Sequence, residues 1–239
     1  MPFWDLYSYF YSLSLGNLFP YRSLLEDLYN TLDIKQGQSV LDAGCGPGLV
    51  IAKILEQDRG REISITGLDI NRTMIRHAHR KCRNFPNVKL QVADLNKSLE
   101  FPDSTFDKVI CSNTLYALNE PQAVISEFHR VLKPGGALII ANPKPKAGEN
   151  TLMKEHVSAL NKLTPLHRKI HQILLSLLLI PAHLVVVAIN RIIIDKGRKG
   201  QYHFLTEKDL QRVLREVGFT NIQISPCYAD QNWLGRAEK

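Results

Sequence analysis

Apolar and polar residues alternate along the chain from residue 38 with two different periods. Short continuous apolar runs, typical of buried strands, are followed by segments in which apolar residues recur every three or four positions, typical of helices. The predicted strands are 39–44, 63–70, 88–94, 106–113 and 137–143, and the predicted helices between them are 49–57, 71–82 and 121–132. Strands that alternate with helices indicate an α/β fold with a parallel sheet and helices on both of its faces.

This order breaks at residues 144–202, which contain no clear strand–helix unit. Regularity returns with a helix over 206–219, for which Thr206 is a typical N-cap and Gly218 a typical C-cap. Two closing strands are predicted, over 220–229 and 231–239. We therefore expect three parts, which are an N-terminal helical cap (1–35), an α/β core (36–143 and 203–239) and an apolar helical insertion (144–202).

The insertion holds a long apolar stretch, from Ile173 to Ile194. Between Lys169 and Arg191 no residue carries a formal charge if the histidines are neutral, and about 20 such residues are long enough to span a bilayer. A single span would, however, place the two halves of the core on opposite sides of the membrane. Pro181 also divides the stretch into two shorter pieces. We therefore expect no transmembrane span, and we interpret the stretch as helices that pack on the core or on a second subunit, or that cover a binding site.

Composition and charge narrow the class of protein. The chain has 239 residues, 44% of them hydrophobic and 22% charged, which excludes a disordered chain. Its net charge of +7 favours an anionic partner, which leaves RNA, an acidic membrane surface and an acidic substrate open. The cysteines are scattered and form no CxxC pair, so we expect neither a zinc site nor disulfides: Cys45, Cys82, Cys111 and Cys227. The N-terminus lacks a basic region and is a poor signal peptide, so we expect a cytoplasmic protein.

A glycine-rich loop, DAGCGPG from Asp42 to Gly48, follows the first predicted strand. Glycines at Gly44, Gly46 and Gly48 let the backbone approach a ligand closely at a strand-to-helix turn. Several classes of nucleotide enzyme use such a turn, so the loop alone does not name the ligand. The carboxylate of Asp42 would repel a pyrophosphate and is suited to a ligand with an ammonium group, such as the methionine end of S-adenosylmethionine.

Two further carboxylates come at the ends of the next strands. Asp69 ends the second strand and can accept hydrogen bonds from both hydroxyls of a ribose, as NAD enzymes also do. Asp94, followed by Leu95, ends the third strand, where a carboxylate can bind the exocyclic amine of adenine. Met74, one turn into the following helix, can pack against a purine. Doubly wound sheets bind ligands at the carboxyl ends of their strands, so the three acids together indicate a nucleotide-like ligand.

These stretches resemble the ordered motifs of class I S-adenosylmethionine-dependent methyltransferases, most closely the subgroup of quinone-biosynthesis and other small-molecule methyltransferases. The similar stretches are VLDAGCGPG, GLDIN, VADLNKSLEFPDSTFDKV, SNTLYAL, HRVLKPGGALII and the closing HFLTEKDLQRVLREVGFTNIQI. The resemblance implies a Rossmann-like seven-stranded sheet whose last strand is antiparallel. It also implies S-adenosylmethionine as cofactor and S-adenosylhomocysteine as product. The implied cofactor contacts are Gly44, Cys45 and Gly46 for the methionine portion, Asp69 for the ribose, Asp94 and Leu95 for the adenine, and beside them Asp42, Gly48, Ile70, Met74 and Asn113.

The residue that would activate the acceptor is less defined. Tyr116, just past the fourth strand, and His203, at the return from the insertion, are the best-placed candidates for a general base. A structural role is the favoured alternative for Tyr116 and an equal one for His203. The [D/N]PP[Y/F] tetrapeptide of enzymes that methylate amines of nucleobases is absent after the fourth strand, where the chain reads SNTLY. Cys111 lies within a strand and is typical of a small buried side chain, so nucleic acid is not the favoured substrate. We expect no metal.

The insertion points to the class of acceptor. In the resembling subgroup, insertions after the fifth strand commonly cover the substrate pocket, which implies an apolar lid and a hydrophobic small-molecule or lipid acceptor. Basic residues flank the apolar stretch and are suited to a peripheral contact with an anionic membrane: Arg168, Lys169, Arg191, Lys196, Arg198 and Lys199. Two alternatives stay open, an RNA methyltransferase and a non-catalytic partner protein that binds the cofactor and uses the insertion as an interface. The methylated atom and the oligomeric state are left undetermined.

Overall fold

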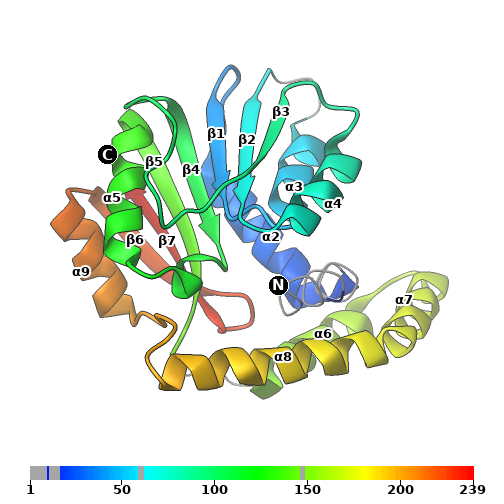
Figure 1. Ribbon diagram of the computed structural model, residues 1–239. Coiled ribbons are helices and arrows are strands. Elements are labelled where there is room, and N and C mark those ends of the chain that lie inside the picture. The colour runs from blue at the N-terminus through cyan, green and yellow to red at the C-terminus, as the bar shows by residue number, and fades with distance from the viewer. Residues whose placement is uncertain (1–9, 11–16, 59–61, 146–148) are drawn as a thin grey trace.

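The computed structural model describes residue 10 and residues 17–58, 62–145 and 149–239 (Figure 1). The predicted N-terminal cap therefore falls partly outside the described residues. Its described part is helix α2 (Phe19–Leu32), on which Leu24, Leu28 and Leu32 are fully buried against the core. Apolar residues four positions apart lie on one face of a helix, and this face docks α2 on the sheet.

Seven strands form one sheet with the order β3-β2-β1-β4-β5-β7-β6. The strands are β1 (Ser39–Ala43), β2 (Ser64–Asp69), β3 (Val88–Val92), β4 (Phe106–Ser112), β5 (Leu132–Pro143), β6 (Thr220–Cys227) and β7 (Asn232–Glu238). The pairs among β1 to β5 are parallel, whereas β7 runs antiparallel to both β5 and β6. The predicted Rossmann-like sheet with an antiparallel last strand is confirmed.

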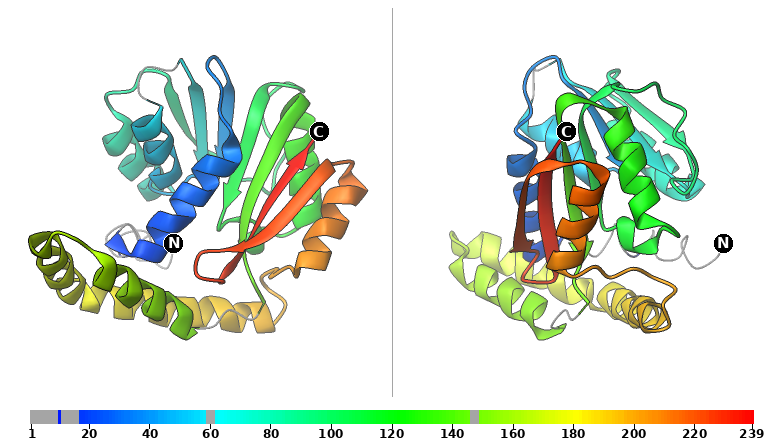
Figure 2. Two further views of the ribbon diagram at one scale, coloured as in Figure 1. Left: turned by 180° about the vertical axis from the view of Figure 1, so that it is seen from behind. Right: turned by 90° about the vertical axis from the view of Figure 1, so that its left-hand side faces the viewer.

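The alternation of side chains along the strands divides the core into two layers. Val40 and Ile110 belong to one hydrophobic cluster with α2 and α3, whereas Leu41 and Val109 belong to the other with α5 and α9. The helices are α3 (Leu49–Gln57), α4 (Arg72–Cys82), α5 (Pro121–Val131) and α9 (Glu207–Val217). Helices on both faces bury nearly continuous apolar strands, as is usual for a parallel sheet (Figure 2).

One strand boundary differs from the prediction. The fifth strand was expected from residue 137, after the breaker KPGG, but β5 begins at Leu132. Leu132 pairs with Phe106, and the register shifts before Lys108 pairs with Ala137. The shift accommodates the extra residues, and Gly135 takes a positive φ of 75°.

Helix α9 begins after Thr206 and ends before Gly218, the two capping residues predicted from the sequence. The Thr206 hydroxyl oxygen accepts a hydrogen bond from the Asp209 backbone N–H and donates one to the Asp209 carboxylate, at 3.2 and 2.6 Å. Gly218 closes the helix in the left-handed region, with a φ of 107°. This helix carries the chain from the insertion back to the sheet.

Three helices occupy the insertion and form a layer across the carboxyl ends of the parallel strands (Figures 1 and 2). They are α6 (Glu149–Lys162), α7 (Leu166–Leu178) and α8 (Ile180–Arg198). Pro181 lies in the first turn of α8, and the axes of α7 and α8 are bent by 55°. Among the described residues, no single helix is both long and apolar enough to cross a membrane, although α7 and α8 together meet those two criteria.

Helix α8 is attached to the core near the short 3-10 helix η2 (Leu115–Ala117). Ile189 and Ile193 of α8 form a buried cluster with Tyr116 of η2. In the last turn of α8, a Cβ atom added to Gly197 would lie 2.1 Å from the Phe204 ring, so the helix and the return segment are in close contact. The insertion therefore packs on the segment that follows β4.

Replacement of Thr206 by Ala tests whether the N-cap of α9 stabilises the return from the insertion. We expect the free energy of unfolding to fall by about 1 kcal/mol, because an N-terminal N–H of the helix loses its acceptor. Urea denaturation measures the change. Thr206→Ser is the matched control, since it keeps the hydroxyl and should lose much less stability; equal losses would show that the cap contributes nothing.

Candidate functional site

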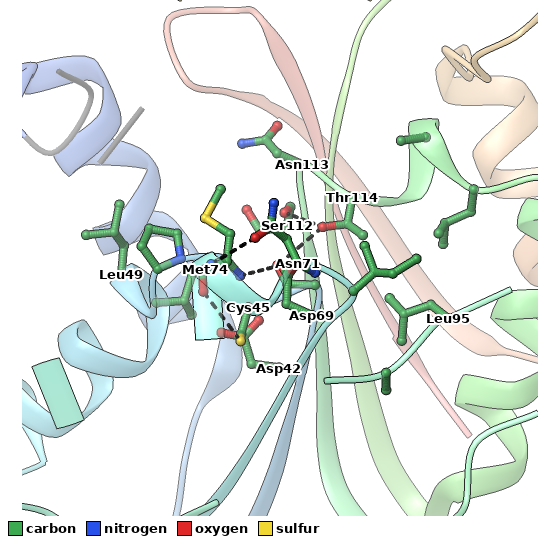
Figure 3. Close-up of a pocket in the computed structure, with 18 of the residues that line it drawn as sticks. Asp42, Cys45, Leu49, Asp69, Asn71, Met74, Leu95, Ser112, Asn113 and Thr114 are labelled. Carbon is green, nitrogen blue, oxygen red and sulfur yellow. Dashed lines mark hydrogen bonds between the residues drawn. The ribbon is translucent and has the colours of Figure 1, made fainter. Parts of the chain in front are cut away.

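A cavity of about 250 Å³ lies at the carboxyl ends of β1, β2 and β4, which is room for an organic ligand rather than for a single ion (Figure 3). Most of the residues predicted from the sequence line it: Asp42, Gly44, Cys45, Gly46, Asp69, Ile70, Met74, Asp94, Leu95, Asn113 and Tyr116. They come from segments that are far apart in the sequence. The cavity forms because parallel strands end at the same edge of the sheet.

Two predicted residues do not line the cavity. Gly48 begins α3 with a φ of 75°, and a Cβ atom there would lie 3.1 Å from Cβ of Ala78. Its small size lets α3 approach α4. His203 lies outside the lining and is joined to it through the backbone. Its N–H donates a hydrogen bond to the carbonyl oxygen of Tyr116, a lining residue, at 2.7 Å.

The glycine loop is shaped by close backbone contacts at one glycine and open space at another. A Cβ atom on Gly44 would lie 2.1 Å from Oγ1 of Thr114, and the residue has a φ of 83°. Gly46 has no atom within 4 Å of the same position, although it lines the cavity. The first glycine therefore seals the loop against the segment after β4, and the second leaves room beside the backbone for a ligand.

Asp42, in β1, is the most constrained charge in the cavity. Its side chain is 1% exposed, and among the described residues its Oδ2 atom has no hydrogen-bond partner. Burial, and then the negative charge of Asp69, raise the pKa of Asp42 to about 7. A buried carboxylate that lacks a partner is unfavourable, so the position favours a ligand with a positive charge or a hydrogen-bond donor.

Asp69 ends β2 and connects two loops of the site. One carboxylate oxygen accepts a hydrogen bond from the Gly46 N–H at 2.9 Å, and the other accepts one from the Asn71 N–H at 2.8 Å. Burial raises the pKa of Asp69, and these two hydrogen bonds oppose the rise. Each carboxylate oxygen can accept a further hydrogen bond, so Asp69 can still bind the hydroxyls of a ligand.

Asn71 sets the position of Met74. Its side-chain oxygen accepts hydrogen bonds from the backbone N–H groups of Thr73 and Met74, at 2.7 and 3.2 Å, and so begins α4. Either Asn71 or Thr73 was a candidate for this cap from the sequence, and the structure selects Asn71. Met74, in the first turn, lines the same cavity as Leu95 across from it (Figure 3).

Cys45, which lines the cavity, and Cys111, in the core strand β4, are buried thiols. Burial, together with the charges of Asp42 and Asp69, raises the pKa of Cys45 well above its usual range. Cys111 is fully buried, and burial raises its pKa to about 12. Both are therefore protonated near neutral pH, and neither has the properties of a nucleophile. This agrees with the interpretation of Cys111 as a small core residue.

The segment after β4 forms the wall beneath the insertion. Asn113 adopts a positive φ of 52°, and its side-chain oxygen accepts a hydrogen bond from the Asn232 amide at 2.7 Å. Tyr116 is 5% exposed; its ring stacks on Phe204 and meets Tyr202 edge-on, each at a centroid distance of 5.5 Å. The cavity wall and the insertion therefore share one aromatic cluster.

Several residues that line the cavity were not predicted from the sequence. Tyr21, on α2, lines the cavity although it precedes the glycine loop by two elements of structure. Thr114 and Ser112 also line it, and their place in SNTLY after the fourth strand was the available signal. Tyr21 had no such signal, because only the packing of α2 on the core brings it to the cavity.

Known proteins of similar sequence and structure include methyltransferases. The model of the family described as "Methyltransferase domain" matches residues 34–218. Demethylmenaquinone methyltransferase of Tropheryma whipplei is 31% identical over 109 residues, covering 46% of this chain and 43% of the relative. Phosphatidylethanolamine N-methyltransferase of Cereibacter sphaeroides is 32% identical over 110 residues, covering 45% of this chain and 51% of the relative.

A solved structure shares the fold over nearly the whole chain. The crystal structure of an S-adenosylmethionine-dependent methyltransferase from Aquifex aeolicus superposes with a TM-score of 0.60 at 18% identity, and the match covers 94% of this chain and 91% of the other. The chain spans about half or less of the length of the two curated relatives. The family model and the shared fold confirm the family that the motifs resemble.

The raised pKa of Asp42 predicts how the ligand-free protein responds to pH. Between about pH 4 and pH 7 the folded state holds a proton on Asp42 that the unfolded state has lost, so the free energy of unfolding falls as pH rises. Asp42→Asn removes this loss, and the variant should therefore gain stability relative to the unmodified protein at pH 8 but not at pH 4. Urea denaturation at both pH values measures the difference, and the same difference at both would contradict the prediction.

The same variant should bind S-adenosylmethionine more weakly. The amide has no charge to offer an ammonium group, and the loss of one charge-assisted hydrogen bond corresponds to about 10- to 100-fold in Kd. Isothermal titration calorimetry at pH 8 measures the affinity. Unchanged affinity in a variant that is more stable would show that Asp42 does not contact the cofactor.

Proposed function

We propose that this chain, which belongs to the methyltransferase-domain family of S-adenosylmethionine-dependent enzymes, transfers a methyl group to a hydrophobic small molecule or lipid at a membrane surface. The observation that carries this proposal is the apolar insertion, since α8 packs on Tyr116 in the wall of the cavity. The family supports the cofactor, and the chemistry of the insertion supports the class of acceptor.

The residues of the cavity fit S-adenosylmethionine. Asp42 would hold the ammonium group, because its buried Oδ2 atom has no hydrogen-bond partner among the described residues. The open space at Gly46 would admit the methionine portion, and Asp69 would accept the ribose hydroxyls. Gly44 and Cys45 would contact the methionine portion beside Gly46, and Asp94 and Leu95 would bind the adenine. The other predicted contacts that line the cavity are Ile70, Met74 and Asn113.

The bound cofactor supplies a methyl group on a sulfonium, which is already activated for transfer. The chain therefore contributes mainly by position, because holding two reactants in line can account for much of the rate. The Gly44 loop, closed against Thr114, is a rigid support for such alignment. The insertion would keep water out of the cavity and bring the acceptor to it.

The acceptor is proposed to be apolar because its cover is apolar. Around Tyr116 the insertion and its return segment present Val185, Ile189, Ile193 and Phe204. A small polar acceptor would lose hydrogen bonds to water there and gain none. Two relatives are named for lipid acceptors, a demethylmenaquinone and a phosphatidylethanolamine, which supports a lipid acceptor, whereas a third is named for the polar phosphoethanolamine. On this proposal residues 144–202 act as the lid.

Of the two candidate general bases, we propose Tyr116, because its side chain lines the cavity whereas His203 is not among the lining residues. Replacement of Tyr116 by Phe keeps the ring and its aromatic contacts, and should lower kcat about 100-fold if the ionised phenolate oxygen of Tyr116 accepts the proton that the acceptor releases. His203→Ala is the control and should leave kcat near that of the unmodified protein. Near-normal turnover of Tyr116→Phe would leave the tyrosine with a structural role only.

Methyl-labelled S-adenosylmethionine, incubated with the protein and a fractionated lysate, tests the acceptor class. We expect label in the solvent-extractable lipid fraction, and mass spectrometry of the labelled band would identify the acceptor. The Asp42→Asn variant is the matched control and should label the fraction more weakly. Label in RNA or protein would contradict the proposed acceptor, and tight cofactor binding without any transfer would indicate a non-catalytic partner protein.

A further inference from the structure

The insertion helix α7 buries a polar side chain and exposes apolar ones, which reverses the usual arrangement in a water-soluble protein. Its buried side chain is Gln172, at 7% exposure, whereas Leu178 on the same helix is 75% exposed. A surface helix normally turns its apolar stripe to the core and its polar face to water. Helix α7 has the opposite arrangement, so its outer face calls for an apolar environment.

A chain of hydrogen bonds holds the polar face of α7 inward. The Gln172 amide donates to the carbonyl oxygen of Asn17 at 3.2 Å, and the Ser176 hydroxyl donates to the Gln172 carbonyl oxygen at 2.8 Å. His156 of α6 completes the chain. Its Nδ1 accepts from the Phe19 N–H at 3.3 Å, and its Nε2 lies 3.1 Å from the Ser176 hydroxyl oxygen. Burial, and then the charges of His183 and Arg22, lower the pKa of His156 and so favour its neutral form.

The outward apolar side chains of α7 continue onto the first turns of α8. We call this set the elbow surface, and its exposed members are Ile170, Leu174, Leu177, Leu178, Ile180 and Leu184. Outside the insertion, few large apolar side chains of the described residues are exposed, among them Phe85. Contiguous exposed apolar surface marks a contact with a partner or a membrane. The 55° bend at Pro181 makes the elbow a projecting corner of the molecule (Figure 1).

The charges on either side of the elbow surface indicate which kind of partner it contacts. Arg168 and Lys169 begin α7, and a second group of cations ends α8: Arg191, Lys196, Arg198 and Lys199. The only acidic residue of the two helices is Asp195, which is paired with Lys199 at 2.7 Å. A symmetric contact between two copies would bring these cations toward one another, whereas an anionic lipid surface would attract them.

We propose that the elbow surface is a docking site for an anionic lipid bilayer, in which α7 and the start of α8 lie in the interface with their apolar side chains among the acyl chains. This inference deepens the proposed function and rests on it for its purpose. Helix α8 contacts the aromatic wall of the cavity through Ile189 and Ile193 and the bilayer through Ile180 and Leu184. A lipid acceptor would therefore pass from the membrane to the cavity along α8.

Flotation of the full chain with lipid vesicles tests the docking site without any acceptor or turnover. We expect the protein to float with vesicles of phosphatidylcholine that contain one-third phosphatidylglycerol, and to float less with phosphatidylcholine alone or at about 0.5 M NaCl. The double variant Leu174→Glu, Leu178→Glu should lower the bound fraction at least about tenfold, because two charges would enter the apolar layer. Phe85→Glu adds the same charge to an exposed apolar site elsewhere and should float as the unmodified protein does.

Variants of the flanking cations, together with a test of folding, distinguish a loss of vesicle binding from a loss of the folded protein. Arg168→Gln and Arg191→Gln should each weaken binding roughly fivefold to anionic vesicles. Calorimetric binding of S-adenosylmethionine shows whether each variant is folded. A protein that binds the cofactor but stays out of the vesicle fraction overturns the docking site and leaves the proposed enzyme class intact. A stable dimer that Leu174→Glu, Leu178→Glu converts to monomers would also overturn it, because the occupant would then be a second copy.

Discussion

The site depends on one constraint, which is that two carboxyl groups come together in the same cavity. Because β1 and β2 are parallel and adjacent, Asp42 and Asp69 come to the same edge of the sheet. Asp69 is stabilised by two backbone N–H groups, whereas Asp42 keeps an oxygen without a partner among the described residues. The fold therefore holds the Asp42 carboxyl group in a position where its charged form is stabilised well only by a bound ligand with donors or positive charge. This is a site prepared for binding rather than optimised for stability.

The apolar composition of the insertion serves two contacts, one with the core of the protein and one, as proposed, with lipid. Its helix α8 is apolar on nearly all sides, with Val186, Ile189 and Ile193 buried and Leu184 exposed. A helix of that kind is normally enclosed by protein or lipid. Packing on the aromatic wall satisfies one side, and the proposed lipid contact would satisfy the other. The same argument explains why α7 keeps Ser176 and Gln172 turned to the protein, where they form hydrogen bonds with His156 of α6 and with Asn17.

Periodicity and local motifs predicted most of the core because those signals are short-range. A strand followed by a glycine loop, an acid at each strand end and paired helix caps are all read within about ten residues, and the sheet order then follows the rules of parallel connections. The boundary of β5 was placed five residues late, since Lys133 to Gly136 read as a breaker. The pairing of Leu132 with Phe106, which local sequence does not reveal, extends the strand.

The sequence by itself determined the family resemblance, the seven-stranded sheet, the glycine loop and the break at Pro181. Only the tertiary structure decided that Tyr21 and Thr114 line the cavity, that Gly48 and His203 lie outside its lining, and that α7 turns its leucines outward. The physical reason is that a helical pattern defines an apolar stripe but not the direction in which the stripe faces. That direction depends on contacts between segments far apart in the chain, such as Gln172 with Asn17, and these exist only once the chain has folded.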